Sequence, residues 1–139
     1  MSPDCFLDTN ILFYAAMGRF SDPAKYERAR FIIAETHFCV SGQVMQEFFV
    51  TVTRKTSTPL STEAALGWLD KIHGCPCAAI DYEIVVNAAK IAKKYMTSYW
   101  DAALIAAAER QGAPILYTED LNHDQSYGSV RVINPFRVH

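Results

Sequence analysis

Short apolar runs alternate with longer amphipathic stretches along the whole chain. The apolar runs predict strands at residues 4–8, 37–40, 77–80, 114–118 and 130–133. Nearly every position in these runs is apolar, which is typical of strands that are covered on both faces of a parallel sheet. The pattern therefore predicts a central parallel sheet of about five strands.

The stretches between the apolar runs have the apolar spacing and the capping residues of helices. A short helix is predicted over residues 10–18. Longer helices are predicted to follow Asp22-Pro23, Ser41, Ser61 or Thr62, Asp81 and Ser98, with Gly74 and Gly112 just beyond the ends of two of them. Strands that alternate with helices predict an α/β fold of three layers, with helices on both faces of the central sheet.

The length of 139 residues predicts a single domain over residues 1–139, because no linker, repeat or low-complexity tract divides the chain. Hydrophobic residues make up 50% of the chain and charged residues 20%, which excludes a disordered protein. No apolar run approaches the roughly 20 residues that cross a bilayer, and no signal peptide is evident at the N-terminus. The sequence therefore predicts a cytoplasmic protein that does not associate with membranes.

The formal net charge of −2 excludes a strongly basic protein that coats nucleic acid. It does not exclude an enzyme that acts on nucleic acid, because clustered carboxylates lower the net charge while bound cations restore a positive potential locally. The positions of the acidic residues are therefore more informative than their number.

Four acidic residues lie next to segments that are expected to form the core. They are Asp8 after the first predicted strand, Glu47 within a hydrophobic helix, Asp101 at the start of an alanine-rich run and Asp120 after the fourth strand. Charges in such places are costly unless they are paired or bound to a cation, and only Arg54 accompanies them in these segments. Asp8 and Asp120 fall at the carboxyl edge of the sheet, where parallel α/β folds bind their ligands.

Each acid also has a structural interpretation that the sequence leaves open. Asp101 is placed like the acidic residue of a capping box that begins at Ser98. Glu47 lies at the border of an apolar helix stripe, where solvated glutamates are common. Asp120, like its neighbour Glu119, is also a typical turn residue.

Acids that converge at one edge of a sheet would repel one another and raise each other's pKa values. Hard divalent cations such as Mg²⁺ or Mn²⁺ take oxygen ligands and reverse that penalty. Hydrolysis of phosphodiester bonds uses this combination, because one cation activates a water molecule and a cation also stabilises charge on the phosphorane and the leaving oxygen. The four acids therefore indicate metal-dependent phosphodiester hydrolysis.

With these residues identified, the chain resembles the PIN-domain ribonucleases, and among them the VapC-type toxins of bacterial toxin–antitoxin pairs. The resemblance covers almost the whole chain and keeps the order of the family's segments. The matching segments are Phe6-Leu7-Asp8-Thr9-Asn10-Ile11-Leu12, Gln46-Glu47-Phe48, Tyr99-Trp100-Asp101-Ala102-Ala103-Leu104-Ile105-Ala106, Leu116-Tyr117-Thr118-Glu119-Asp120 and Ile133-Asn134-Pro135-Phe136.

The resemblance implies a catalytic acidic quartet that binds Mg²⁺ or Mn²⁺, made of Asp8, Glu47, Asp101 and Asp120. It also implies that Thr9 and Asn10 orient the first aspartate, and that Thr118 contributes a hydroxyl near the metal or the phosphate. It further implies endonucleolytic cleavage of RNA, a homodimer, and neutralisation by a small antitoxin protein whose tail enters the active-site groove.

Three other functions are compatible with parts of the pattern. A phosphoacceptor receiver domain is also a small parallel α/β protein, with Asp81 as its acceptor, but Glu47 and Asp101 would then have no role. A metal-dependent nuclease directed at DNA or at flap structures would use the same four acids. A PIN-like domain without catalysis would bind RNA or serve as a scaffold, and the complete quartet argues against it.

Two aromatic residues, Tyr99 and Trp100, directly precede Asp101. Their position beside an acid of the quartet makes them candidates for stacking on a base of the substrate. Core packing is nevertheless the expected role of Trp100.

Overall fold

The computed structural model describes residues 2–137 and contains, in these residues, six helices and one six-stranded sheet. The strands are β1 (Cys5–Leu7), β2 (Phe38–Ser41), β3 (Cys77–Ala78), β4 (Ile115–Tyr117), β5 (Ser126–Tyr127) and β6 (Val130–Ile133). The helices are α1 (Thr9–Met17), α2 (Pro23–Glu35), α3 (Gly42–Arg54), α4 (Thr62–Ile72), α5 (Tyr82–Tyr95) and α6 (Tyr99–Arg110). No helix within residues 2–137 is long and apolar enough to span a membrane.

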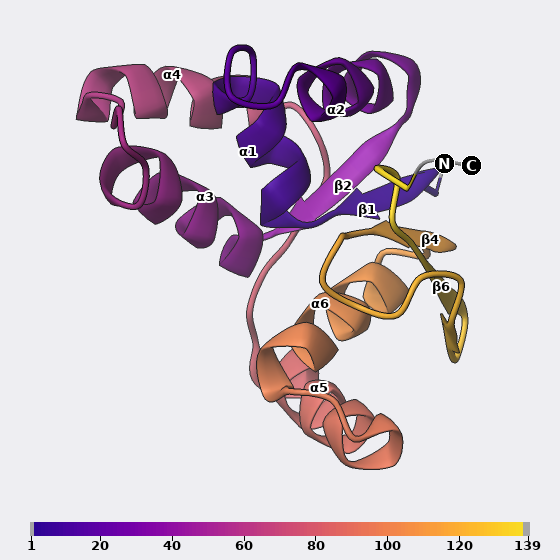
Figure 1. Cartoon of the computed structure of the whole chain (residues 1–139). Coiled ribbons are helices and arrows are strands. Elements are labelled where there is room, and N and C mark those ends of the chain that lie inside the picture. Colours follow the sequence, from indigo (N-terminus) through magenta and orange to yellow (C-terminus); the bar gives the residue numbers. More distant parts are fainter. Residues whose placement is uncertain (1, 138–139) are drawn as a thin grey trace.

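The sheet has the strand order β3-β2-β1-β4-β6-β5. Neighbouring strands are parallel except β5 and β6, which are antiparallel. In Figure 1, α1, α2 and α4 lie above the sheet with α3 beside them, and α5 and α6 lie below it. The predicted three-layer α/β fold around a parallel sheet is thus confirmed.

The five predicted strands are all present, and the sheet has a sixth, β5, that the sequence pattern does not predict. Strand β5 has two residues and is followed by a turn in which Gly128 has a φ of +61°. A strand of this length is too short to show the alternation by which strands are recognised in a sequence.

Hydrogen bonds in the first turns confirm the predicted helix caps. The backbone N–H of Val44 donates to Ser41 Oγ (3.3 Å), and that of Asp101 donates to Ser98 Oγ (3.1 Å). Helix α1 begins one residue before the predicted range, and Asp8 is its N-cap. An acid of the predicted quartet therefore also begins a helix.

The core lies between the sheet and the two helix layers. Phe6 of β1, Leu116 of β4, Phe48 of α3 and Ile105 of α6 are completely buried. Helices α5 and α6 pack through small side chains such as Ala88, which allow the helices to approach closely. This packing fixes the start of α6 relative to the sheet.

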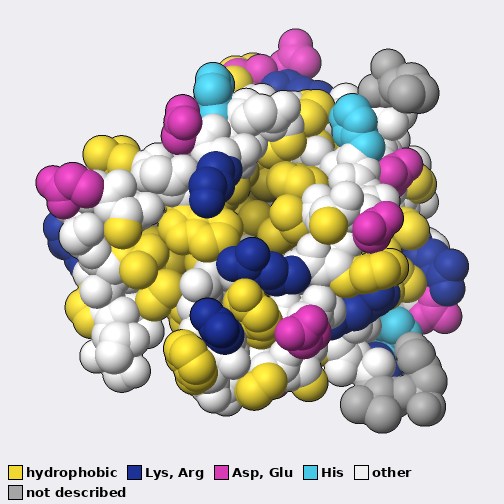
Figure 2. All heavy atoms as spheres, turned by 90° about the horizontal axis from the view of Figure 1, so that it is seen from above, with side chains coloured by type: hydrophobic (Ala, Val, Ile, Leu, Met, Phe, Trp, Pro, Cys, Tyr) yellow, Lys and Arg dark blue, Asp and Glu magenta, His cyan; other side chains and the backbone are white. Residues whose placement is uncertain are grey.

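The outer side of the layer formed by α1, α2 and α4 is hollowed. Figure 2 shows apolar side chains gathered in the hollow, with several Lys and Arg side chains around them. On this side a cavity of about 270 Å³ is lined by apolar residues, including Leu12 and Trp68, and by Arg30 and Lys71. The charged groups of Arg30 and Lys71 lie 5.8 and 5.1 Å from the centre of the Trp68 ring.

Candidate functional site

The strand order reverses at β1, which pairs with β2 on one side and with β4 on the other. The carboxyl ends of β1 and β4 therefore form a topological switch point, the usual ligand site of parallel α/β sheets. Asp8 follows β1 directly, and Thr118 and Asp120 follow β4.

Asp8 is buried, with 5% of its surface exposed. Its carboxylate accepts hydrogen bonds from the Thr118 hydroxyl (2.8 Å), the Thr9 backbone N–H (2.6 Å) and the Asn10 amide (3.3 Å). Burial raises the pKa of Asp8 from 3.8 to about 6 despite the bonds from Thr118 and Thr9, and the charges of Asp120 and Glu47 raise it further. The site thus holds a carboxylate that is costly to ionise.

Asn10 and Thr118 connect Asp8 to Asp120. The Asn10 Nδ2 that contacts Asp8 also donates to Asp120 Oδ2 (3.2 Å), and Thr118 Oγ1 accepts from the backbone N–H of Asp120 (3.1 Å). Partial burial raises the pKa of Asp120, and the negative charge of Glu119 adds to this. Smaller contributions to the same increase come from the charges of Asp101 and Glu47.

Glu47 is joined to the start of α1 by the Thr9 hydroxyl, which donates to Glu47 Oε2 (3.1 Å). Gln43 Nε2 donates both to Glu47 Oε1 (3.3 Å) and to the backbone oxygen of Trp100 (3.3 Å). These bonds connect α3 with the first turns of α1 and α6.

Asp101 has no side-chain bond to the other three acids. Its backbone N–H is capped by Ser98, as in the structural interpretation of this residue, but within residues 2–137 its carboxylate accepts no hydrogen bond. Its charge nevertheless acts on Asp120. The structure therefore brings three acids together through Thr9 and Asn10, and the fourth acts on them by its charge.

Neighbouring acids differ from the quartet because they have cationic partners. Lys25 Nζ lies 2.8 Å from Glu119 Oε2, and Arg131 is paired with Asp124. In the part of the chain that the structure describes, none of the four quartet acids forms a salt bridge. This contrast separates Asp120 from Glu119 beside it, a distinction that the sequence does not make.

The donor atoms of the site fit a hard cation that keeps part of its water shell. Within residues 2–137 no three His, Cys, Asp or Glu side chains lie close enough to hold one ion together. Mg²⁺ typically uses one or two carboxylates and retains several waters, which suits acids at this spacing. The buried Asn10 Oδ1 has no hydrogen-bond partner among the described residues and is a further oxygen available to a water or an ion.

Asp81, the acceptor in the receiver-domain alternative, has a structural role here. It caps α5, and Arg110 Nη1 and Nη2 donate to its two carboxylate oxygens (2.7 and 2.8 Å). These bonds from Arg110 lower the pKa of Asp81 to about 2. It follows β3 at the edge of the sheet, away from the switch point between β1 and β4.

The expected core packing of Trp100 is wrong, because 66% of this residue is exposed. The inward positions of α6 carry alanines, and Trp100 stands in the first turn beside Tyr99, with the ring centres 5.1 Å apart. Sequence analysis also missed Gln43, which bridges Glu47 and Trp100. Its spacing of four residues from Glu47 on one helix was the available signal.

Solved structures with a similar fold include toxins at low sequence identity. VapC20 of Mycobacterium tuberculosis, described as a toxin that cleaves the sarcin–ricin loop, is 16% identical with a TM-score of 0.66; the match covers 84% of this chain and 89% of that chain. For a toxin–antitoxin complex from Klebsiella pneumoniae the identity is 16%, the TM-score 0.73 and the coverage 96% and 99%. For VapBC2 of Rickettsia felis, bound to a DNA fragment from its promoter, the values are 15%, 0.64, and 92% and 96%. At these identities the likeness establishes the fold.

No curated protein matches the chain in sequence. The family model of the PIN domain matches residues 5–128. This range includes all four acids of the quartet and the strands whose ends form the switch point. The chain therefore belongs to the PIN domain family.

Proposed function

We propose that the chain is a metal-dependent endoribonuclease, which hydrolyses phosphodiester bonds of RNA, and that it is the toxin of a toxin–antitoxin pair. The observation that carries the proposal is a group of carboxylates at the switch point of a PIN domain that form no salt bridge with a Lys or Arg of residues 2–137. Unpaired acids at a ligand-binding edge are best explained by a cation, and a cation among acids suits the chemistry of phosphate esters.

PIN domains generally use divalent metal ions. In the proposed site Asp8, Glu47, Asp101 and Asp120 hold Mg²⁺ or Mn²⁺, either directly or through water. The bound ion would supply Lewis-acid activation of water and stabilise charge on the phosphate. The chain's own contribution is orientation: Thr118 fixes the carboxylate of Asp8.

Thr9 and Asn10 fix the relative positions of the acidic side chains. The Thr9 hydroxyl donates to Glu47 and so connects it to the start of α1. The Asn10 Nδ2 group donates to both Asp8 and Asp120. Partners of this kind set the geometry of ligands that contact a metal, and their loss usually weakens metal binding or activity.

We propose a small antitoxin protein and a second copy of the chain as partners. The toxin–antitoxin complexes with similar folds support the antitoxin. The hollow over α1, α2 and α4 supports it as well, because an apolar floor with Arg30 and Lys71 at its side suits a helix that has an apolar face and acidic flanks.

Cleavage assays on purified RNA and DNA test the proposal. We expect the wild type to cut structured RNA at internal positions in the presence of Mg²⁺ or Mn²⁺, to lose this activity in chelator, and to leave DNA intact. Asp124→Asn is a matched control, since it removes an acid of the same region that is paired with Arg131, and it should cut like the wild type. Cleavage of DNA in preference to RNA would instead support a nuclease of another specificity, and cleavage of neither would support a binding module.

Thr118→Val should lower the cleavage rate by about 10- to 100-fold, the usual effect of losing an outer-shell partner of a metal site. The variant keeps the side-chain shape but removes the hydroxyl that donates to Asp8 and accepts from the Asp120 N–H. Because that bond lowers the pKa of Asp8, its loss should also move the acid limb of the pH–rate profile to higher pH. Thr118→Ser should restore both values; a profile unchanged in Thr118→Val would contradict the proposed role.

A further inference from the structure

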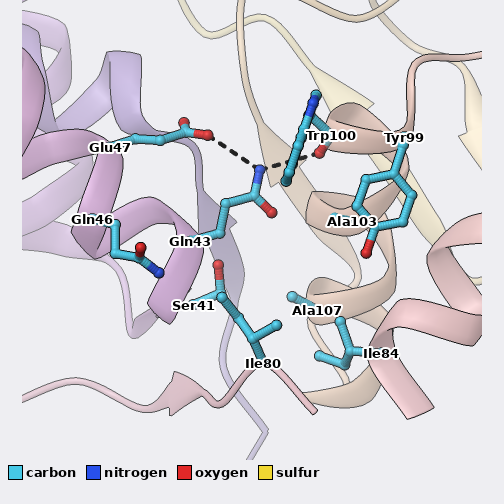
Figure 3. A pocket seen from close by; sticks show the side chains of 10 residues that line it. All are labelled: Ser41, Gln43, Gln46, Glu47, Ile80, Ile84, Tyr99, Trp100, Ala103 and Ala107. Carbon is cyan, nitrogen blue, oxygen red and sulfur yellow. Dashed lines mark hydrogen bonds between the residues drawn. The ribbon is translucent and has the colours of Figure 1, made fainter. Parts of the chain in front are cut away.

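We infer that a pocket between α3 and α6 receives one unpaired base of the RNA, beside the phosphate that the acidic quartet would hold. The inference rests on the proposed nuclease function and adds to it a means of recognising the substrate. The pocket is bounded by the first two turns of α3, the first three turns of α6, and the first turn of α5 with the segment before it, as Figure 3 shows.

The size and walls of the pocket suit a flat aromatic ring. Its volume is about 240 Å³, which is below the roughly 300–1,000 Å³ of pockets for drug-sized ligands. Ile84, Ala103 and Ala107 form apolar walls, and all three are buried. A single base fits such a space, whereas a whole nucleotide or a protein helix does not.

Trp100 gives this pocket an aromatic surface that the fold itself does not use. It is 66% exposed, although large apolar side chains are usually buried. The Tyr99 ring packs edge-on against Trp100, with ring centres 5.1 Å apart, and Tyr99 also packs against the buried alanines between α5 and α6. Exposed aromatic rings of this kind are the surfaces on which unpaired bases stack.

Amide side chains supply hydrogen-bonding groups at the opposite wall. Gln43 Nε2 is already used by Glu47 and by the Trp100 backbone, as Figure 3 shows, which leaves Gln43 Oε1 as an acceptor. Gln46 lines the same wall, and its side chain makes no hydrogen bond within residues 2–137. The amide oxygens of Gln43 and Gln46 are two acceptors, which suit the two N–H groups of an exocyclic amino group, as in adenine or cytosine, better than the single N3–H of uracil.

The pocket and the acidic site share Glu47. Its carboxylate lines the pocket and also accepts from Thr9, whose backbone N–H contacts Asp8. A nucleotide whose phosphate lies at the acids therefore has its own or the next base within reach of the pocket. This continuity favours RNA as the occupant over a protein side chain, which would leave the amides of Gln43 and Gln46 facing an apolar group.

Binding of tetranucleotides tests the inference without relying on cleavage. The chain has two tryptophans, so Trp68→Phe makes Trp100 the reporter, and Asp8→Asn keeps the RNA intact. We expect oligo(A) and oligo(C) tetramers to quench Trp100 fluorescence at concentrations at least about 5-fold lower than oligo(U). An abasic tetramer of the same charge should not quench it.

Variants of the pocket identify the groups responsible. Trp100→Ala should weaken the binding of labelled oligo(A), measured by anisotropy, by about 5- to 100-fold, the usual effect of losing one stacked base. Trp100→Phe should retain most of the affinity, and Gln46→Ala should reduce the preference over oligo(U). Phe20→Ala is the matched control, since Phe20 is 86% exposed and lies outside the pocket, and it should bind like the parent.

Equal affinity of Trp100→Ala and its parent for all tetramers would overturn the inference, even if the variant lost affinity for a protein partner. Failure of the proposed function has a different signature. In that case the wild type leaves RNA intact, whereas failure of the base pocket alone leaves cleavage in place and identical in wild type and Trp100→Ala.

Discussion

Asp8→Asn is expected to lower RNA cleavage by more than the roughly 10- to 100-fold that accompanies loss of an outer-shell partner of a metal site. Among the four acids, Asp8 is the one that is buried, and it accepts hydrogen bonds from Thr118, Thr9 and Asn10. An amide cannot replace the charge of this carboxylate toward a cation. It does preserve the size of the side chain, so the loss can be assigned to charge.

The same substitution should leave the metal-free protein at least as stable as the wild type at pH 7. Burial raises the pKa of Asp8 from 3.8 to about 6, so the folded state binds a proton more readily than the unfolded state. The stability that the protonated form contributes is present below about pH 4 and is lost as the pH rises through about 6. At pH 7 the ionised carboxylate is thus unfavourable, and a neutral amide avoids this cost.

An amide at position 8 also finds partners in the surrounding hydrogen bonds. Its oxygen can accept from the Thr9 N–H, and its NH₂ group can donate to Thr118 Oγ1, because a hydroxyl both donates and accepts. Thermal unfolding in chelator at pH 7 and at pH 4.5 measures the effect, with the difference between the two proteins expected to shrink at the lower pH. A marked loss of stability in the variant at pH 7 would show that Asp8 is a structural carboxylate.

Millimolar Mg²⁺ or Mn²⁺ is expected to raise the melting temperature of the wild type by about 10 °C if the ion exceeds its dissociation constant about 100-fold. Binding to the folded state alone then contributes about 2.7 kcal/mol, and about 1 kcal/mol shifts the melting temperature of a chain of this length by roughly 4 °C. The shift should be larger at pH 7.5 than at pH 5, because protons compete with the ion for Asp8, whose pKa is about 6.

The matched comparison is the double variant Asp8→Asn and Asp101→Asn, which should show little or no shift. Ca²⁺ at equal ionic strength distinguishes selective binding from general screening of charge. An equal shift in the wild type and the double variant would place the ion elsewhere on the protein. Melting curves recorded at several metal concentrations also give the affinity without any assumption about the reaction.

The fold was predictable because its elements carry local signals. The strand at Cys5–Leu7 is a short apolar run, and Ser41 and Ser98 each accept from a first-turn N–H group that has no partner within its own helix. The two-residue strand β5 carries no such signal, because among the described strands it pairs with β6 alone and its turn depends on Gly128.

The site was predictable as a set of residues but not as a set of contacts. The acids stood out because each lies beside an apolar segment. The bonds that join them, from Thr9 to Glu47 and from Asn10 to Asp120, link residues 38 and 110 positions apart, and such pairing depends on how the helices pack. The exposure of Trp100 has the same origin, since it is set by what covers the first turn of α6.

Because Asp8 follows β1 directly, the availability of metal ions would affect the stability of the protein as well as its activity. Within residues 2–137 no Lys or Arg forms a salt bridge with Asp8, so its buried, ionised carboxylate destabilises the metal-free protein at neutral pH, and a bound ion would remove that cost. In a cell depleted of the ion, the rate of RNA cleavage and the amount of folded protein would then both fall. The metal-free protein would unfold more often, and unfolded protein is more readily degraded.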